Sequence, residues 1–243
     1  MQATTKTQHH TTHMNNNLRK LILLALTGMT LTISVQAADR ILIKDTFSRG
    51  TVDAPLELAD SAPDIGIEKE TWQVSPSGDR FPKTTDGTSL SASFKWGQSA
   101  KLAFTPAQGN VYTLSVDVSN MSEDRWGILF GFSSNIDVDA TGNLDTYAPS
   151  SLLTPNGNIQ EFATAFSKIF ASSVGEPSPG LTNLKIVLDT TDTQWAVSFY
   201  TNDVLVSKGV YTYETNPSIS AIAIGGGDAT ATFHNLSLTQ SAP

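Results

Sequence analysis

Hydrophobic and polar residues alternate in short stretches along most of the chain after residue 38. In the clearest stretch, Val111–Ser119, apolar side chains occupy every second position, with mostly polar side chains between them. The four apolar residues are Tyr112, Leu114, Val116 and Val118. Because successive side chains of a strand point to opposite faces, this pattern predicts a β-strand with one buried face.

A second stretch, residues 126–132, predicts a strand whose two faces differ in size. Trp126 shares one face with Ile128, Phe130 and Phe132, which places this tryptophan in the predicted core. The other face carries glycine, leucine and glycine. A neighbouring strand or a ligand can therefore approach the backbone closely on that side.

The C-terminal half contains further strands of the same kind. Residues 184–188 and 195–200 alternate, and Trp195 is in phase with apolar residues, so it too is predicted to join the core. Asn202-Asp203 then precedes an apolar run, and two turn-forming residues between strands predict a tight hairpin. Further strands are predicted near residues 40–47, 71–75, 89–94, 101–104, 218–224 and 229–238.

Two features modify the pattern near the C-terminus. Gly225-Gly226-Gly227 is expected to form a loop after a strand rather than a phosphate-binding site. The apolar positions change phase between Phe233 and Leu236. This change predicts a β-bulge at His234-Asn235.

One segment, residues 159–169, is compatible with two structures. Ile159, Phe162, Phe166 and Ile169 have the spacing of one helix face. Phe162, Phe166 and Phe170, with alanine and serine between them, also suit a strand. Elsewhere, many short strands separated by turns about every ten residues predict an all-β fold, a two-sheet antiparallel jelly-roll sandwich.

The N-terminal region has the organisation of a secretory signal peptide. Arg19 and Lys20 precede an apolar run, and Val35 and Ala37 supply the small residues of a cleavage site. We expect a signal peptide at residues 14–37 and one sandwich domain at 38–243, with 1–13 an upstream extension or a mis-assigned start. A membrane anchor is the alternative, but the threonines and serine after residue 26 make the span poorly apolar.

Removing residues 1–37 changes the inventory of chemical groups. The segment holds three of the 15 basic residues, none of the acidic ones and three of the four histidines, so the net charge changes from −8 to −11. A strongly acidic protein is a poor ligand for nucleic acid or anionic membranes. The chain has no cysteine and therefore no disulfide. We expect a protein that is secreted, periplasmic or at the cell surface, with no membrane partner after cleavage.

Two segments resemble the concanavalin A-like jelly-roll superfamily, which includes legume lectins, laminin-G-like domains and glucanases. Lys44-Asp45-Thr46-Phe47-Ser48-Arg49 resembles the D-x-F-x-R opening of exported bacterial members. The C-terminal third resembles their last strands, with W-x-V-x-F at 195–199, I-x-I-G at 222–225 and a closing strand at 233–238. His234 stands where the superfamily usually has aspartate. The resemblance implies the jelly-roll fold and a glycan-related function.

An acidic turn at 137–145 is the candidate metal site. Its oxygen-bearing residues have the spacing of positions 1, 3, 5, 7 and 9 of a calcium loop. They are Asp137, Asp139, Thr141, Asn143 and Asp145. Ala148 stands where an EF-hand needs a bidentate carboxylate, so the alternatives are a non-helical calcium turn and a solvated acidic turn. Calcium is the one cofactor that the sequence indicates.

Catalysis is disfavoured by the residues present. Glucanases of this superfamily carry E-x-D-x-x-E on one strand, whose glutamates perform retaining hydrolysis. Asp137 matches the middle acid, whereas Asn135 and Ala140 replace both glutamates. After cleavage His234 is the one histidine left, which weakens a serine–histidine–aspartate arrangement. No catalytic residue is assigned.

Binding of a polysaccharide or cell-surface glycan is the leading hypothesis. Trp96 and Tyr147 are less clearly in phase with a core face than Trp126 and Trp195, and they are therefore the candidate platforms for sugar rings. We predict a secreted non-catalytic carbohydrate-binding or adhesion module. The alternatives are a divergent polysaccharide-degrading hydrolase or lyase, and a structural cell-surface or matrix protein.

Overall fold

The computed structural model describes residues 38–67, 69–75, 83–122, 126–138, 147–164, 167–173, 181–206 and 209–242. All of them belong to Ala37–Pro243, the second of two units into which the chain divides. Their regular secondary structure is entirely β-strand, in two antiparallel sheets. Across these residues, no helix has the length and hydropathy needed to cross a membrane.

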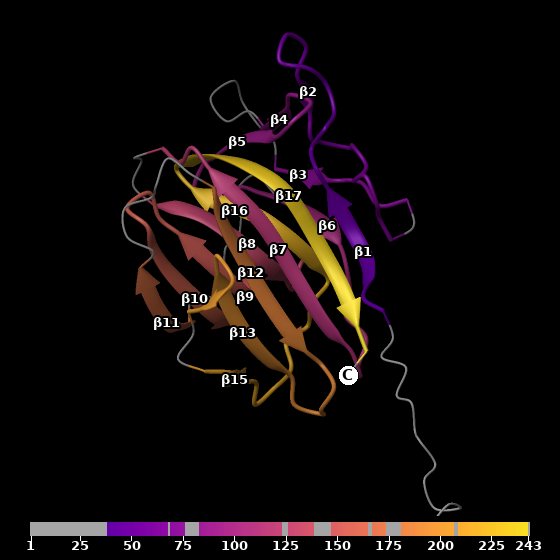
Figure 1. The fold of residues 1–243 in the computed structure, drawn as a ribbon, viewed down its shortest axis with the longest axis vertical. Helices are drawn as coiled ribbons and strands as arrows, with labels where there is room; N and C mark the ends of the chain where they lie inside the picture. The colour runs from indigo at the N-terminus through magenta and orange to yellow at the C-terminus, as the bar shows by residue number, and fades with distance from the viewer. Residues whose placement is uncertain are drawn as a thin grey trace, which may run out of the picture. The chain divides into compact units, whose positions relative to one another are not determined.

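The larger sheet has ten strands among the described residues, and Figure 1 shows its central strands side by side. Its main path is β14 (Val204–Leu205), β13 (Ala196–Thr201), β12 (Thr182–Asp189), β7 (Val111–Ser119), β17 (Ala229–Ser241), β5 (Leu90–Phe94), β4 (Lys83–Thr85) and β2 (Leu56–Glu57). In addition, β1 (Arg40–Asp45) pairs with β17, and β15 (Tyr211–Thr212) pairs with β13.

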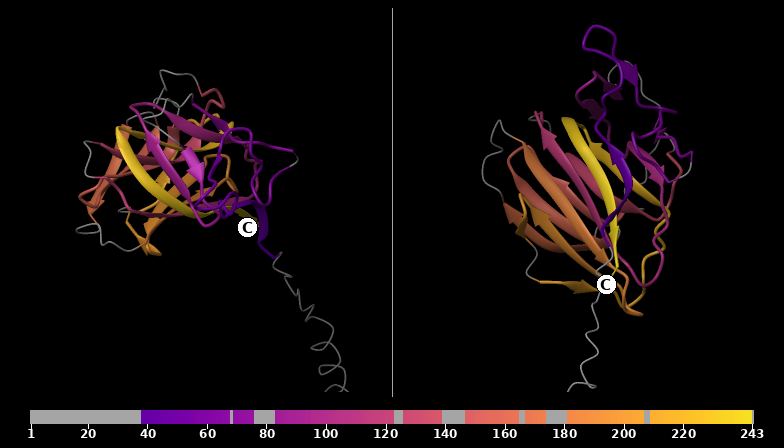
Figure 2. Two further views of the ribbon diagram at one scale, coloured as in Figure 1. Left: turned by 90° about the horizontal axis from the view of Figure 1, so that it is seen from above. Right: turned by 45° about the vertical axis from the view of Figure 1, so that its right-hand side comes forward.

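The smaller sheet packs face to face with the larger one (Figure 2). It has seven strands among the described residues, in the order β11 (Ser167–Ser173), β10 (Asn158–Thr164), β9 (Tyr147–Leu153), β8 (Gly127–Ser133), β16 (Ala221–Gly227), β6 (Ser99–Ala103) and β3 (Gln73–Val74). The helical alternative for residues 159–169 is therefore wrong. Hydrogen bonds to β9 hold β10 in the sheet, and the aromatic residue Phe162 lies on its outer face.

The hydrophobic core lies between the sheets, as the alternation predicts. Strand β7 alternates between buried and half-buried positions along its whole length. Its apolar residues meet those of β8, such as Phe130 and Phe132, in one continuous buried cluster. Full burial of each such side chain stabilises the fold by about 1.5–3 kcal/mol.

The D-x-F-x-R segment is a structural clamp at the end of β1. The buried carboxylate of Asp45 accepts hydrogen bonds from the Phe47 backbone N–H, the Arg49 guanidinium and the Trp72 indole, each at 2.8 Å. Arg49 also donates to the carbonyl oxygen of Ala62 at 2.8 Å. The clamp therefore fastens β1 to the long segment that leads to β3.

The predicted hairpin and bulge are both confirmed. Asn202 and Asp203 have φ values of 49° and 63°, which the favoured two-residue hairpin turn requires, and they join β13 to β14. The register of β17 against β7 shifts between His234 and Ser237, with Asn235 at a φ of 49°. The Asn235 side chain donates to Asp117 Oδ2 at 3.0 Å, which closes the bulge locally.

Glycines in the smaller sheet allow close approach of its strands. A Cβ at Gly131 would lie 2.3 Å from the Pro149 carbonyl oxygen of β9. Strand β9 therefore occupies the space beside the glycines of β8 that the sequence predicted to be open to a neighbouring strand or a ligand. The expectation of a loop at 225–227 is wrong, because these glycines continue β16 to Gly227 and pair with β8.

Candidate ligand-binding site

Two tryptophans meet at one end of the smaller sheet. Strands β6 and β8 both run antiparallel to β16, so they begin at the same end of the sheet, where β16 finishes. Trp96 lies in the turn that leads into β6, and Trp126 immediately precedes β8. Gly227, the last residue of β16, lies between them.

The two indoles form an exposed aromatic corner. Their ring centroids are 4.8 Å apart and their planes are inclined by 62°. Trp96 is 44% exposed and Trp126 is 49% exposed. Large aromatic surfaces that remain in water at this level, side by side, are characteristic of interaction sites.

A small apolar pocket adjoins this corner on the outer face of the sheet. Its volume is about 130 Å³. The described residues that line it are Trp96, Trp126, Leu129, Leu152, Gln160, Phe162 and Gly227. Among these described side chains, polar groups are limited to the indole N–H groups of the two tryptophans and the amide of Gln160, which can both donate and accept hydrogen bonds.

Strand alternation explains why these residues share one face. In the ladder, Leu152 lies directly opposite Leu129 on one side and Gln160 on the other. Leu129 and Phe162 are buried together in a small apolar cluster with Ala223, separate from the main core. The pocket therefore has a well-packed floor, with the two indoles as its wall.

Backbone hydrogen bonds fix the turn that carries Trp96. The Gly97 N–H donates to the Gly226 carbonyl at 3.1 Å, and the Gly226 N–H donates to the Gln98 carbonyl at 3.2 Å. The Lys95 N–H donates to Gln98 Oε1 at 3.0 Å. Because the turn is attached to β16, Trp96 is held against the end of the sheet.

The buried side chain of Lys83 contacts the turn that carries Trp96. The Lys83 ammonium lies 3.3 Å from Gln98 Oε1 and 5.2 Å from the centroid of the Phe94 ring. Burial lowers the pKa of Lys83 to about 8, although the charge of Glu57 acts in the opposite direction. Lys83 is thus a structural neighbour of the tryptophan turn.

The structure corrects one aromatic prediction and confirms another. Trp126 was predicted to be a core residue from its parity, and this is wrong because β8 begins only at Gly127. Trp195 does pack against the core, as predicted, and its indole N–H donates to Gln108 Oε1 at 2.8 Å.

The two predicted sugar platforms lie at opposite ends of the smaller sheet. Tyr147 pairs with Ser133 at the last position of β8, whereas Trp96 lies near the start of that strand. The Tyr147 side chain is outside the described residues, so its role as a platform stays a prediction. The structure brings Trp96 together with Trp126 instead.

The acidic turn is described only at its first member. Asp137 lines a polar cavity of about 550 Å³ with Lys69, Glu70, Thr71 and Gln73. Asp139, Thr141, Asn143 and Asp145 lie outside the described residues.

Lys101 holds the backbone at the start of this turn. Its ammonium donates to the carbonyl oxygens of Asn135 and Asp137, each at 2.9 Å. The Lys101 ammonium therefore already binds two backbone oxygens at the start of the predicted calcium turn. No cluster of three histidine, aspartate or glutamate side chains suited to a metal occurs in the described part of the chain. Calcium binding stays a prediction.

Glu161 is a buried acid that the residue pattern of the segment 159–169 did not reveal. It lies on β10 between two residues that line the pocket, but it shares the parity of Ile159 and Ala163 and faces the interior. It is 0% exposed, and neither carboxylate oxygen has a side-chain hydrogen-bond partner among the residues that the structure describes. Burial raises the pKa of Glu161 to about 7.

Comparison with solved structures identifies the fold. An endo-1,3-beta-glucanase from Streptomyces sioyaensis superimposes with a TM-score of 0.53 and 11% identity, covering 86% of this chain and all of that one (100%). A Bacillus subtilis protein of unknown function with a galectin-like fold gives 0.53 and 14%, covering 85% of this chain and 98% of that one.

The carbohydrate recognition domain of Emp46p, in its potassium-bound form, gives a TM-score of 0.51 and 8% identity, covering 69% of this chain and 87% of that one. No protein-family description and no curated protein sequence matches the chain. At these identities the likeness concerns the fold alone. With its two antiparallel sheets and these structural neighbours, the chain has the concanavalin A-like jelly-roll fold.

Proposed function

We propose that the chain is a secreted, non-catalytic carbohydrate-binding or adhesion module that binds a polysaccharide or cell-surface glycan at the Trp96–Trp126 pocket. The observation that carries the proposal is the half-exposed pair of indoles beside a pocket with one amide group. A sugar ring has apolar C–H faces that pack on aromatic rings and hydroxyls that need hydrogen-bond partners. The pocket offers both kinds of contact.

The inclination of the indoles favours one ring in a corner over a flat surface. With planes 62° apart, one indole can stack on the face of a sugar while the other contacts its edge. The small volume of the pocket matches a single sugar residue, such as a chain end or a side branch. Gln160 is positioned at the pocket to hydrogen-bond a hydroxyl of that residue.

The fold does not distinguish binding from hydrolysis, but one observation beside the pocket favours binding. The domain shares its fold with a carbohydrate recognition domain as well as with a glucanase, so the fold is compatible with either activity. The carboxylate nearest the pocket along β10, that of Glu161, faces the interior and has no access to a ligand at the indoles.

The test is a glycan array followed by retention of the full, exported protein on the polysaccharides that bind. Trp96→Ala and Trp126→Ala should each weaken binding about tenfold. Tyr200→Ala is the matched control, because this aromatic residue lies on the larger sheet, packed under Lys185. Unchanged binding in both tryptophan variants, or equal loss in the Tyr200 variant, would overturn the assignment of the pocket.

A further inference from the structure

Strand β10 places a buried acid between two pocket residues. The side chains of Gln160 and Phe162 line the pocket on the outer face of the sheet. Glu161, between them, projects to the opposite face, where its neighbours of the same parity belong to the core. Any displacement of β10 that brings water to Glu161 must therefore also move the pocket lining.

The surroundings of Glu161 do not stabilise a negative charge. Ser151 lies directly opposite on β9, and within the described part of the chain neither it nor any other side chain donates a hydrogen bond to either carboxylate oxygen. Burial raises the pKa of Glu161 and its own backbone N–H lowers it, and no charged residue in the described ranges contributes. The ionised form is thus unpaired and desolvated, which is strongly unfavourable in a protein interior.

Tyr213, which hydrogen-bonds to the backbone of β10, is also uncharged. The Tyr213 hydroxyl donates to the Ala163 carbonyl oxygen at 3.0 Å, and Tyr211 contacts the Tyr213 ring. Burial raises the pKa of Tyr213, so this phenol stays neutral at every pH relevant here.

We infer that the protonation state of Glu161 controls the ligand pocket. When Glu161 is neutral, β10 stays paired in the sheet. When Glu161 is ionised, opening of β10 is favoured, and this opening displaces Gln160 and Phe162. The effect on glycan affinity rests on the proposed function, whereas the effect on β10 does not. Below neutral pH the carboxyl is protonated and the pocket is intact. Above neutral pH, opening exposes the carboxylate to water and weakens the pocket.

Hydrogen exchange of the full protein tests the strand directly. Exchange of peptides that cover β10 is compared at about pH 5.5 and about pH 8.5, after correction for the intrinsic effect of pH, with β7 as the internal reference. Opening of β10 should increase about tenfold in the wild type and not in Glu161→Gln. An equal increase in Glu161→Gln, or no increase in the wild type, would overturn the inference.

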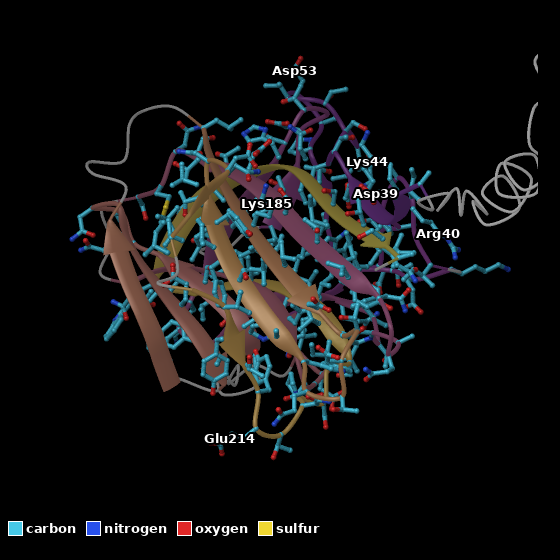
Figure 3. All side chains as sticks on the ribbon, turned by 60° about the horizontal axis from the view of Figure 1, so that its bottom comes forward. Asp39, Arg40, Lys44, Asp53, Lys185 and Glu214 are labelled. Carbon is cyan, nitrogen blue, oxygen red and sulfur yellow. The ribbon has the colours of Figure 1, made fainter. Side chains whose placement is uncertain are left out.

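Two further variants complete the design. Glu214→Gln removes an exposed carboxylate at the end of the domain (Figure 3) and should behave as the wild type does. Glu161→Met replaces the acid by an apolar side chain of similar length and should also abolish the pH dependence, which covers the case in which the Gln variant fails to fold.

Affinity measurements then address the glycan. With a ligand from the array, the wild-type dissociation constant should rise about tenfold between the two pH values and that of Glu161→Gln should stay constant. If no glycan binds at either pH, the proposed function fails while the exchange result still decides the inference about β10. If a glycan binds with the same affinity at both pH values, the function stands and the proton dependence of the pocket is wrong.

Discussion

The ring of Trp96 lies directly over Gly227, so close that a Cβ at residue 227 would be 2.6 Å from the ring carbon Cε3. The same added Cβ at residue 227 would lie 3.1 Å from the Cβ of Trp126. Both tryptophans therefore owe their positions to the absence of a side chain at the end of β16. A residue with no functional group of its own determines the geometry of the aromatic corner.

Gly227→Ala should displace Trp96 and weaken glycan binding about tenfold, with a loss of stability of about 1–3 kcal/mol from overpacking. Binding assays and tryptophan fluorescence report the two effects. Gly109→Ala is the control, since its φ of +87° is strained for alanine but nothing lies within 4 Å of the added carbon. Equal effects of both variants on binding would contradict the role of Gly227.

Asp45→Asn should destabilise the domain by about 3–5 kcal/mol, because the substitution removes a buried charge that pairs with Arg49 and accepts three hydrogen bonds. Urea unfolding measures the change. Asp53→Asn, at an exposed loop position labelled in Figure 3, should change stability by less than about 0.5 kcal/mol. A similar loss in both variants would argue against the clamp.

Glu161 predicts that the domain loses stability as the solution becomes alkaline. Its folded-state pKa is raised from 4.5 to about 7, so its contribution is complete below about pH 4.5 and is lost as the pH rises through about 7. The loss is at most about 3 kcal/mol. Glu161→Gln should therefore melt at a higher temperature than the wild type at about pH 8 and at nearly the same temperature at about pH 4.5. An equal difference in melting temperature between the wild type and Glu161→Gln at the two pH values would contradict this prediction.

The predicted signal peptide at residues 14–37 leads to an expectation for the first residue of the mature protein. N-terminal sequencing of protein recovered outside the cytoplasm of a secreting bacterium should give Ala38. A mature protein that begins at Met1 or Met14 would show that residues 14–37 are retained.

The acidic turn predicts a calcium effect on thermal stability. Millimolar calcium should raise the melting temperature, and a chelator should reverse the rise, since a ligand that binds only the folded state stabilises it. Asp137→Asn should reduce the rise. An unchanged melting temperature in calcium would leave the turn as a solvated surface segment.

Period-two alternation was sufficient to predict the fold because several strands, among them β5, β7, β12 and β17, alternate between buried and less buried positions. It failed for β9, where serines and Pro149 interrupt the apolar pattern. It also failed at Trp126, since parity does not reveal where a strand begins, and one position before β8 the side chain is free to leave the core. Glu161 could not be predicted because residues 159–169 fitted a helix as well as a strand.

The long final strand has a consequence for how the domain forms. Strand β17 pairs with β1, β5 and β7, so it joins the first described strand to the centre of the larger sheet. Contacts over such large sequence separations form late and slowly. The larger sheet therefore cannot be completed before β17 has been synthesised, and until then the edges of β1, β5 and β7 that pair with it have no partner strand there.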